Sequence, residues 1–150
     1  MTRAIYFDMD GTIANLYGVD GWLNNLEHEQ TRPYREAKPM VNMRALSHEL
    51  NRLQRAGYVV GIVSWLSKSG TTEYNNKVTK TKMQWLDRHI GSVQFDEIHI
   101  IKYGTPKSTV VNVPNEILFD DEERNRKEWA LGDGMAFGVD NILEILRCMG

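Results

Sequence analysis

Strand-like apolar segments alternate with helix-like segments along most of this 150-residue chain. Five short segments rich in apolar residues are predicted as strands: residues 3–8, 58–64, 97–101, 116–119 and 135–137. Four longer segments are predicted as helices: residues 40–56, 73–90, 122–131 and 139–149. Strands that alternate with helices indicate a parallel sheet covered on both faces, which is a three-layer α/β fold. On the longest helix we expect the buried face to carry Val78, Met83, Leu86 and Ile90.

The length and composition fit one globular domain over residues 1–150. The chain is 41% hydrophobic and can bury a core without disulfides, and its single cysteine excludes an internal disulfide framework. The first apolar run is too short for a signal peptide, and none approaches the roughly 20 residues of a membrane span. We therefore expect a soluble, cytoplasmic protein with no membrane partner. A net charge of −2 gives no strong signal for nucleic-acid binding.

Clustered carboxylates follow the first predicted strand directly. Asp8 and Asp10 lie two residues apart in "FDMDGT", and Gly11 and Thr12 come next. An Asp-Gly pair is also common in plain turns. However, like charges this close cost free energy unless a cation or a shared proton lies between them. The pattern therefore favours a cation site after this strand.

Other polar residues stand at or near the ends of later strands. Ser64 ends the second strand, Asp120 and Asp121 follow the fourth, and Lys107 precedes the fourth in "YGTPKSTV". Lys102 is the alternative. We favour Lys107 because of its spacing before the acidic pair. The carboxyl ends of parallel strands meet at one edge, so these side chains should face a shared cleft.

The chemistry of this set points to phosphoryl transfer. Clustered carboxylates suit Mg²⁺, which keeps several waters and is usually completed by a substrate phosphate. Positioning and charge neutralisation then supply most of the catalysis. A carboxylate such as Asp8 can attack phosphorus, and a second one, Asp10, can exchange protons with the leaving group and water. Asp120 and Asp121 could also cap the following helix, which is compatible with binding metal.

The segments "FDMDGT", "VSW", "PKS" and "FDDEERN" occur in the order of the four motifs of the haloacid dehalogenase (HAD) superfamily, and they resemble its phosphatase branch. The resemblance implies a Rossmann-like fold and Mg²⁺-dependent hydrolysis of phosphate monoesters through an aspartyl-phosphate. It also implies a role for each matched residue: Asp8 as nucleophile and metal ligand, Asp10 as acid/base and metal ligand through its backbone carbonyl, Ser64 and Lys107 as phosphate-binding residues, Asp120 as metal ligand, and Asp121 as its support. We also predict that Gly11 and Thr12 bind phosphate. Arg124 and Asn125 could order the acidic loop or be surface residues of the following helix.

A narrower resemblance concerns the second half of the chain. The segments "KMQWLDRHIG", "EIHI" and "KSTVVNVPNEILFDDEERN" are similar to the 5′(3′)-deoxyribonucleotidase branch, which implies a nucleoside (deoxy)monophosphate as substrate. Trp65 after the serine of the second motif departs from that branch, and the cap segment here is shorter.

Residues 15–38 are predicted to form a minimal cap with one short helix and a turn, leaving the site open. Tyr17 and Trp22 in this segment, together with Trp65, are candidates for stacking on a base, although large aromatic residues also pack in cores. Two alternatives stay open: a phosphatase acting on a nucleic-acid end or a phosphoprotein, and a non-catalytic regulator that binds metal or phosphate. A basic groove beside the site would favour a polymer, and an aromatic slot would favour a nucleotide.

Overall fold

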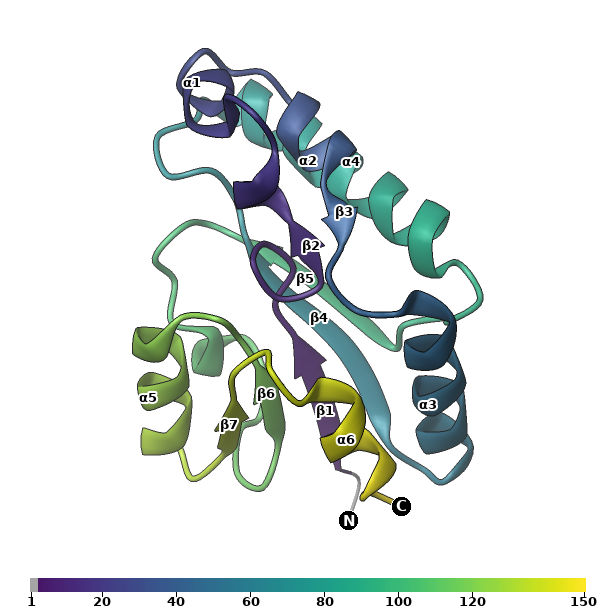
Figure 1. Cartoon of the computed structure of the whole chain (residues 1–150). Coiled ribbons are helices and arrows are strands. Elements are labelled where there is room, and N and C mark those ends of the chain that lie inside the picture. The colour runs from purple at the N-terminus through teal and green to yellow at the C-terminus, as the bar shows by residue number, and fades with distance from the viewer. Residues whose placement is uncertain (1–2) are drawn as a thin grey trace.

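The computed structural model describes residues 3–150. Five strands form one parallel sheet in the order β5-β4-β1-β6-β7 (Figure 1). They are β1 (Ala4–Phe7), β4 (Val59–Trp65), β5 (Glu97–Ile101), β6 (Ile117–Phe119) and β7 (Met135–Phe137). Each predicted strand is present within about a residue or two of its expected bounds. The predicted three-layer α/β fold with a central parallel sheet is therefore confirmed.

Helices cover both faces of this sheet. One face packs on α3 (Met43–Arg55), α4 (Thr72–Ile90) and α6 (Ile142–Arg147). The other packs on α5 (Glu123–Leu131) and on the valines of residues 110–113, which follow the short 3-10 helix η2 (Lys107–Thr109). Alternate side chains of a strand point to opposite faces. Ile5 and Phe7 of β1 accordingly join the larger core, while Tyr6 joins the smaller one.

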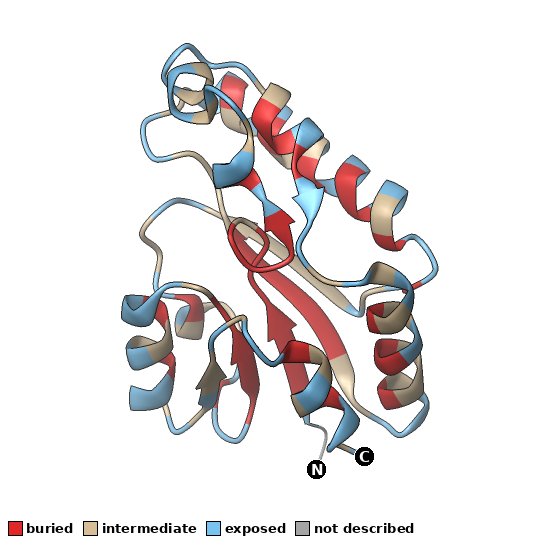
Figure 2. Ribbon diagram, in the orientation of Figure 1, coloured by how far each residue is buried: buried red, intermediate tan, exposed pale blue. Residues whose placement is uncertain are grey.

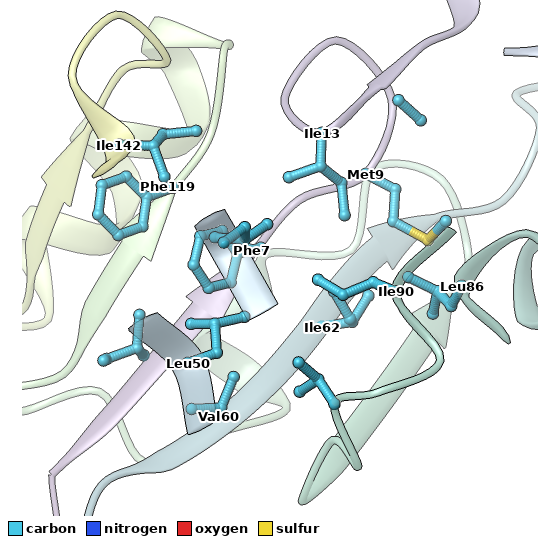
Figure 3. Close-up of a cluster of buried hydrophobic side chains, with 14 of the residues drawn as sticks. Phe7, Met9, Ile13, Leu50, Val60, Ile62, Leu86, Ile90, Phe119 and Ile142 are labelled. Carbon is cyan, nitrogen blue, oxygen red and sulfur yellow. The ribbon is translucent and has the colours of Figure 1, made fainter. Parts of the chain in front are cut away.

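The larger core lies between the sheet and helices α3, α4 and α6. Figure 2 shows β1 and β4 buried along most of their length, and Figure 3 shows Leu50, Ile62 and Ile142 converging on the same apolar layer. Phe7 stacks on Phe119 with ring centroids 5.1 Å apart. This contact joins β1 to β6, the two strands that carry the acidic residues at their carboxyl ends.

Local signals explain where the two longest helices begin and end. The side chain of Asn42 accepts a hydrogen bond from the amide of Ala45 and caps α3, and Thr71 caps α4 in the same way. After α3, Gly57 has φ of 99°, a left-handed conformation that glycine adopts at no steric cost.

The buried face of α4 differs from the predicted one. Val78, Lys82 and Leu86 recur every fourth residue and are buried, whereas Met83 is 42% exposed. The prediction for Met83 is wrong because residue 82, one helical turn from both Val78 and Leu86, takes the inward position. A lysine therefore occupies a core position of this helix.

The cap is also richer than predicted. It contains β2 (Ala14–Asn15), the 3-10 helix η1 (Leu16–Gly18), α1 (Trp22–Glu27), α2 (Arg32–Glu36) and β3 (Lys38–Pro39). Strands β2 and β3 pair antiparallel, and Leu16 and Tyr34 pack against Tyr74 and Val78 of α4. The prediction of one short helix and a turn is wrong because this apolar contact with α4 stabilises elements too short to persist alone.

The sheet has a switch point between β1 and β6. The chain runs from β1 to β4 and β5 on one side and then crosses to β6 and β7 on the other. Parallel sheets of this kind bind ligands outside the carboxyl ends of the strands at such a point. The cap lies over this end of the sheet (Figure 1). No helix within residues 3–150 is long and apolar enough to cross a membrane.

Candidate active site

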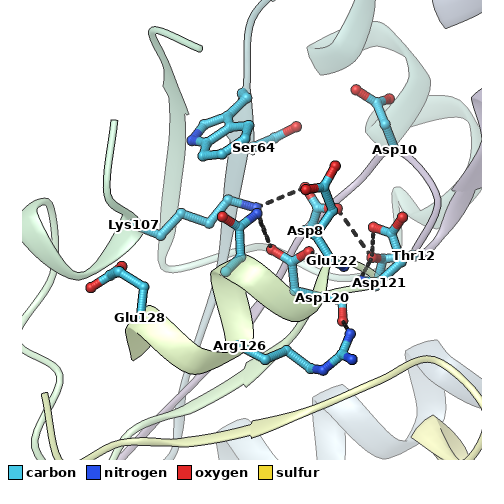
Figure 4. A network of polar contacts seen from close by, with 12 residues as sticks. Asp8, Asp10, Thr12, Ser64, Lys107, Asp120, Asp121, Glu122, Arg126 and Glu128 are labelled. Carbon is cyan, nitrogen blue, oxygen red and sulfur yellow. Dashed lines mark hydrogen bonds and ion pairs between the residues drawn. The ribbon is translucent and has the colours of Figure 1, made fainter. Parts of the chain in front are cut away.

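Asp8 and Asp120 lie next to each other at the switch point. The register pairs Phe7 with Phe119, and the amide of Asp8 donates to the carbonyl of Phe119 at 2.9 Å. The residues that follow the two strands are therefore neighbours. Asp8, Asp120 and Asp121 each offer one carboxylate oxygen, and these atoms lie within 4.8 Å of one another (Figure 4).

Lys107 joins the two buried aspartates. Its Nζ lies 3.0 Å from Asp8 Oδ1 and 2.6 Å from Asp120 Oδ2. Burial alone would lower the pKa of Lys107, but the charges of Asp8 and Asp120 outweigh it and raise that pKa, so the ammonium stays protonated. Lys102, the alternative from the sequence, is exposed. The structure thus brings Lys107, and not Lys102, to the acidic cluster.

The first turn of α5 holds Asp120. Asn125 Nδ2 donates to Asp120 Oδ2 at 3.1 Å, and the amide of Glu122 donates to Asp120 Oδ1 at 2.9 Å. Burial and the charge of Asp8 raise the pKa of Asp120 to about 6. Arg126 Nη1 donates to the backbone carbonyl of Asp120 at 3.0 Å, while Arg124 is exposed. Asn125 thus contacts the acidic loop, and the arginine that contacts it is Arg126 and not Arg124.

Gly11 and Thr12 shape the acidic cluster. Thr12 Oγ1 lies 3.1 Å from Asp8 Oδ2 and 3.2 Å from Asp121 Oδ1, and it accepts a hydrogen bond from the Asp121 amide. Gly11 has φ of 82°, and a Cβ there would lie 2.4 Å from Asp121 Oδ2. The Gly11 amide donates to the carbonyl of Ala14 inside the turn. Phosphate binding by Gly11 and Thr12 stays a prediction.

The environment of Asp121 disfavours its charged form. Burial, followed by the charge of Asp8, raises the pKa of Asp121 to about 7. The cluster therefore holds its protons more tightly than isolated aspartates do. A bound cation would reverse this effect because it favours the ionised carboxylates.

Asp10 and Ser64 are joined by a lysine that sequence reasoning missed. Lys82 Nζ lies 2.8 Å from Asp10 Oδ2 and 2.7 Å from Ser64 Oγ. Burial raises the pKa of Asp10, and the charge of Lys82 opposes that shift. Figure 4 shows Asp10 set apart from the Asp8–Asp120 pair. The signal was the spacing of Lys82 between Val78 and Leu86, because a lysine on an apolar helix face needs a buried partner.

A cavity of about 860 Å³ opens beside the acidic cluster and has aromatic walls. Tyr17 and Trp22 meet on the cap side with ring centroids 4.9 Å apart, and Trp65 and Tyr103 meet at 4.8 Å. All three predicted stacking candidates therefore line the cavity, and Tyr103 joins them. Trp65 also has other contacts: its Nε1 donates to the carbonyl of Thr105, and Lys107 Nζ lies 5.5 Å from its ring centroid.

The donor set of this site fits a hard divalent cation. Carboxylate oxygens are the ligands that Mg²⁺ prefers. Asp8, Asp10 and Asp121 line the cavity, and Asp120 is buried next to Asp8. Of these four carboxyl groups, Lys82 contacts that of Asp10, and Lys107 contacts those of Asp8 and Asp120. The ionised site is thus two negative charges in excess, which one divalent cation would balance.

Together, the switch-point sheet and this acidic edge define a three-layer α/β protein with a carboxylate cluster that could hold a cation. Comparisons with protein-family models and with curated protein sequences find no match. Solved structures do match over nearly the whole chain. The D,D-heptose 1,7-bisphosphate phosphatase from Burkholderia thailandensis superimposes with a TM-score of 0.61 at 12% identity, covering 98% of this chain and 97% of that one.

Two further solved structures carry ligands. The D,D-heptose 1,7-bisphosphate phosphatase from B. bronchiseptica, complexed with magnesium and phosphate, has a TM-score of 0.56 at 14% identity over 90% of this chain and 79% of that one. A HAD family enzyme from Bacteroides thetaiotaomicron, also with magnesium and inorganic phosphate, has a TM-score of 0.53 at 9% identity over 92% of this chain and 94% of that one. The chain therefore has the fold of HAD-family phosphatases.

Proposed function

We propose that this protein is a Mg²⁺-dependent phosphatase that hydrolyses a small phosphate monoester through an aspartyl-phosphate. The observation that carries the proposal is the placement of Asp8 at the cavity floor, beside the Asp120–Asp121 pair and 3.0 Å from the Lys107 ammonium. Fold neighbours solved with magnesium and phosphate support the same chemistry.

The proposed reaction assigns each step to a residue of the site. A carboxylate oxygen of Asp8 attacks phosphorus, so that an Asp8–phosphorus bond forms and the ester P–O bond breaks. Asp10, whose pKa is raised by burial, gives its proton to the departing alkoxide. Asp10 then takes a proton from water as that water attacks the phosphorus. Inorganic phosphate leaves, and Asp8 is regenerated.

Asp8 and Asp120 would hold the metal, with the backbone carbonyl of Asp10 as the resemblance implies. Bound Mg²⁺ would neutralise charge on the phosphoryl oxygens. Lys107 and Ser64 are proposed to hold the phosphoryl group. Asp121 shares the Thr12 hydroxyl with Asp8 and so helps to keep the cluster in place.

We further propose a nucleoside monophosphate as the substrate. A cavity of about 860 Å³ is of the size that takes one small ligand, and the four aromatic residues of the two pairs line it and are candidates for stacking on a base. Two lysines line it, Lys68 and the already paired Lys107, together with Glu27, Glu29 and Glu122. Acidic side chains at this cavity disfavour the many phosphates of a nucleic acid. The aromatic slot thus favours a nucleotide over a polymer.

Phosphate release, measured with Mg²⁺ and with EDTA, tests the proposal. The panel holds ribo- and deoxyribonucleoside 5′- and 3′-monophosphates, sugar phosphates that include a heptose bisphosphate, a 3′-phosphorylated oligonucleotide and a phosphopeptide. We expect metal-dependent release that is fastest with a nucleotide. The Asp8→Asn variant should lose activity by on the order of 10³-fold or more, and Asp20→Asn, at an exposed cap position, should not.

Each contrary outcome points to another function. Faster release from the oligonucleotide or the phosphopeptide would mean that the substrate is a polymer, and it would leave the proposed phosphatase chemistry unchanged. Mg²⁺ binding without release from any compound would favour a non-catalytic regulator. Full activity in Asp8→Asn would refute the assignment of the nucleophile.

A further inference from the structure

The ammonium group of Lys82 uses all of its hydrogen-bond donors inside the protein. It donates to Asp10 Oδ2 at 2.8 Å, to Ser64 Oγ at 2.7 Å and to the backbone carbonyl of Trp65 at 2.7 Å. An ammonium group has three N–H donors. Lys82 is also 1% exposed and does not line the cavity. It therefore has no free donor with which to bind a substrate directly.

Lys82 connects three parts of the chain that are distant in sequence. It projects from the middle of α4 to the turn after β1 at Asp10 and to the end of β4 at Ser64. Its ammonium also lies 5.1 Å from the ring centroid of Tyr34 in the cap. Burying a charge costs free energy unless it is paired and hydrogen-bonded. An apolar residue would pack on this buried face of α4 without that cost, so packing alone does not account for a lysine at position 82.

The contacts of Lys82 set the orientation of both partners. Because Asp10 Oδ2 is bound to Lys82, the other oxygen, Oδ1, is left without a donor from residues 3–150. Asp10 lines the cavity, so that oxygen is available to a ligand. Ser64 Oγ accepts from Lys82, and a hydroxyl group has one hydrogen of its own to donate. That hydrogen must point away from the ammonium.

From this geometry we infer that Lys82 is a positioning residue for the acid/base Asp10 and for the phosphate-binding Ser64. The inference rests on the proposed function. Lys107 serves the nucleophile and the metal site, while Lys82 orients the carboxyl group that transfers protons. Loss of Lys82 should therefore impair proton transfer to the leaving group more than attack on phosphorus.

Two esters that differ in the basicity of the leaving group separate these effects. Phenyl phosphate releases a basic phenolate that needs a proton, whereas 4-nitrophenyl phosphate releases a weakly basic one. The value of kcat/KM reports the steps up to release of the phenol. A residue that only stabilises the fold would change both substrates by the same factor. A residue that positions Asp10 would change phenyl phosphate more.

The experiment compares kcat/KM for both esters, with saturating Mg²⁺, in wild type, Lys82→Met, Asp10→Asn and Lys80→Met. We expect Lys82→Met to lose at least about tenfold more activity on phenyl phosphate than on 4-nitrophenyl phosphate, as in Asp10→Asn. Lys80→Met is the matched control because Lys80 is exposed on the same helix. Thermal unfolding establishes that each variant folds. If Lys82→Met does not fold, Lys82→Gln, which keeps a polar but shorter side chain, replaces it.

Equal losses on both esters, or no loss on either, in a folded variant would overturn the inference and leave the proposed function intact. If wild-type protein with Mg²⁺ hydrolyses neither these esters nor any compound of the panel above, the proposed function fails, and this inference falls with it. The leaving-group pattern therefore tests Lys82 separately from the phosphatase activity.

Discussion

Lys107 Nζ lies 2.6 Å from Asp120 Oδ2, and both side chains are buried. The same ammonium group lies 3.0 Å from Asp8 Oδ1, so it bridges residues that follow two adjacent strands. A buried charge that loses its partner is strongly destabilising. The geometry of the proposed catalytic site and the stability of the fold thus depend on the same ion pair.

Replacing this lysine should separate Lys107 from its sequence alternative. Lys107→Met leaves Asp8 and Asp120 without their shared cation, so we expect the free energy of unfolding to fall by about 3–5 kcal/mol and turnover to be lost. Lys102→Met, at an exposed position, should change stability by less than about 0.5 kcal/mol. Urea unfolding without metal measures the free energy of unfolding of both variants, and phosphate release with Mg²⁺ measures their turnover. Similar losses in the two variants would contradict the assignment.

Removing the charge of Asp120 should weaken metal binding. The Asp120→Asn variant keeps the shape of the side chain but removes a charged oxygen from the three-carboxylate cluster. We expect Mg²⁺ affinity, measured by isothermal titration calorimetry, to fall by at least about tenfold. Asp140→Asn, at an exposed site outside the cluster, serves as the control. An unchanged titration in Asp120→Asn would show that the cation binds elsewhere.

The raised pKa of Asp121 should make the metal-free protein less stable as the pH rises. The folded pKa is about 7, above the usual value of about 4, so the folded state binds this proton more tightly than the unfolded state does. The stabilisation that the protonated Asp121 side chain gives the folded state is fully present below about pH 4 and is lost as the pH rises through about 7. In EDTA, the free energy of unfolding should therefore decrease less in Asp121→Asn than in wild type between about pH 5 and about pH 8. Equal decreases would contradict this.

The aromatic slot should affect nucleotides selectively. Trp22 packs against Tyr17 at the cavity, with ring centroids 4.9 Å apart. Because stacking of one base contributes about 1–3 kcal/mol, Trp22→Ala should raise KM for a nucleoside monophosphate by roughly tenfold. KM for a sugar phosphate without a base should change little. An equal rise for both compounds would mean that Trp22 only packs the cap.

Much of the candidate site follows from residues that stand next to strands in the sequence. Asp8, Asp120 and Asp121 each come directly after an apolar strand or one residue later, and parallel strands end at a common edge. Their convergence could therefore be predicted from the sequence. The cap could not, because its short helices are stabilised by contacts between Tyr34 and α4, about 40 residues further along the chain.

The α/β class, the order of the strands and helices, and the chemical identity of the acidic edge follow from the amino-acid sequence alone, because these depend on local apolar patterns and on residues adjacent to strands. Three contacts became visible only in the folded protein: Lys107 rather than Lys102 contacts Asp8, Lys82 contacts Asp10 and Ser64, and Tyr103 packs against Trp65 at the cavity. Those contacts depend on how a helix or loop turns its side chains toward strands distant in sequence. A buried charge is placed by such long-range partners, which local periodicity does not encode.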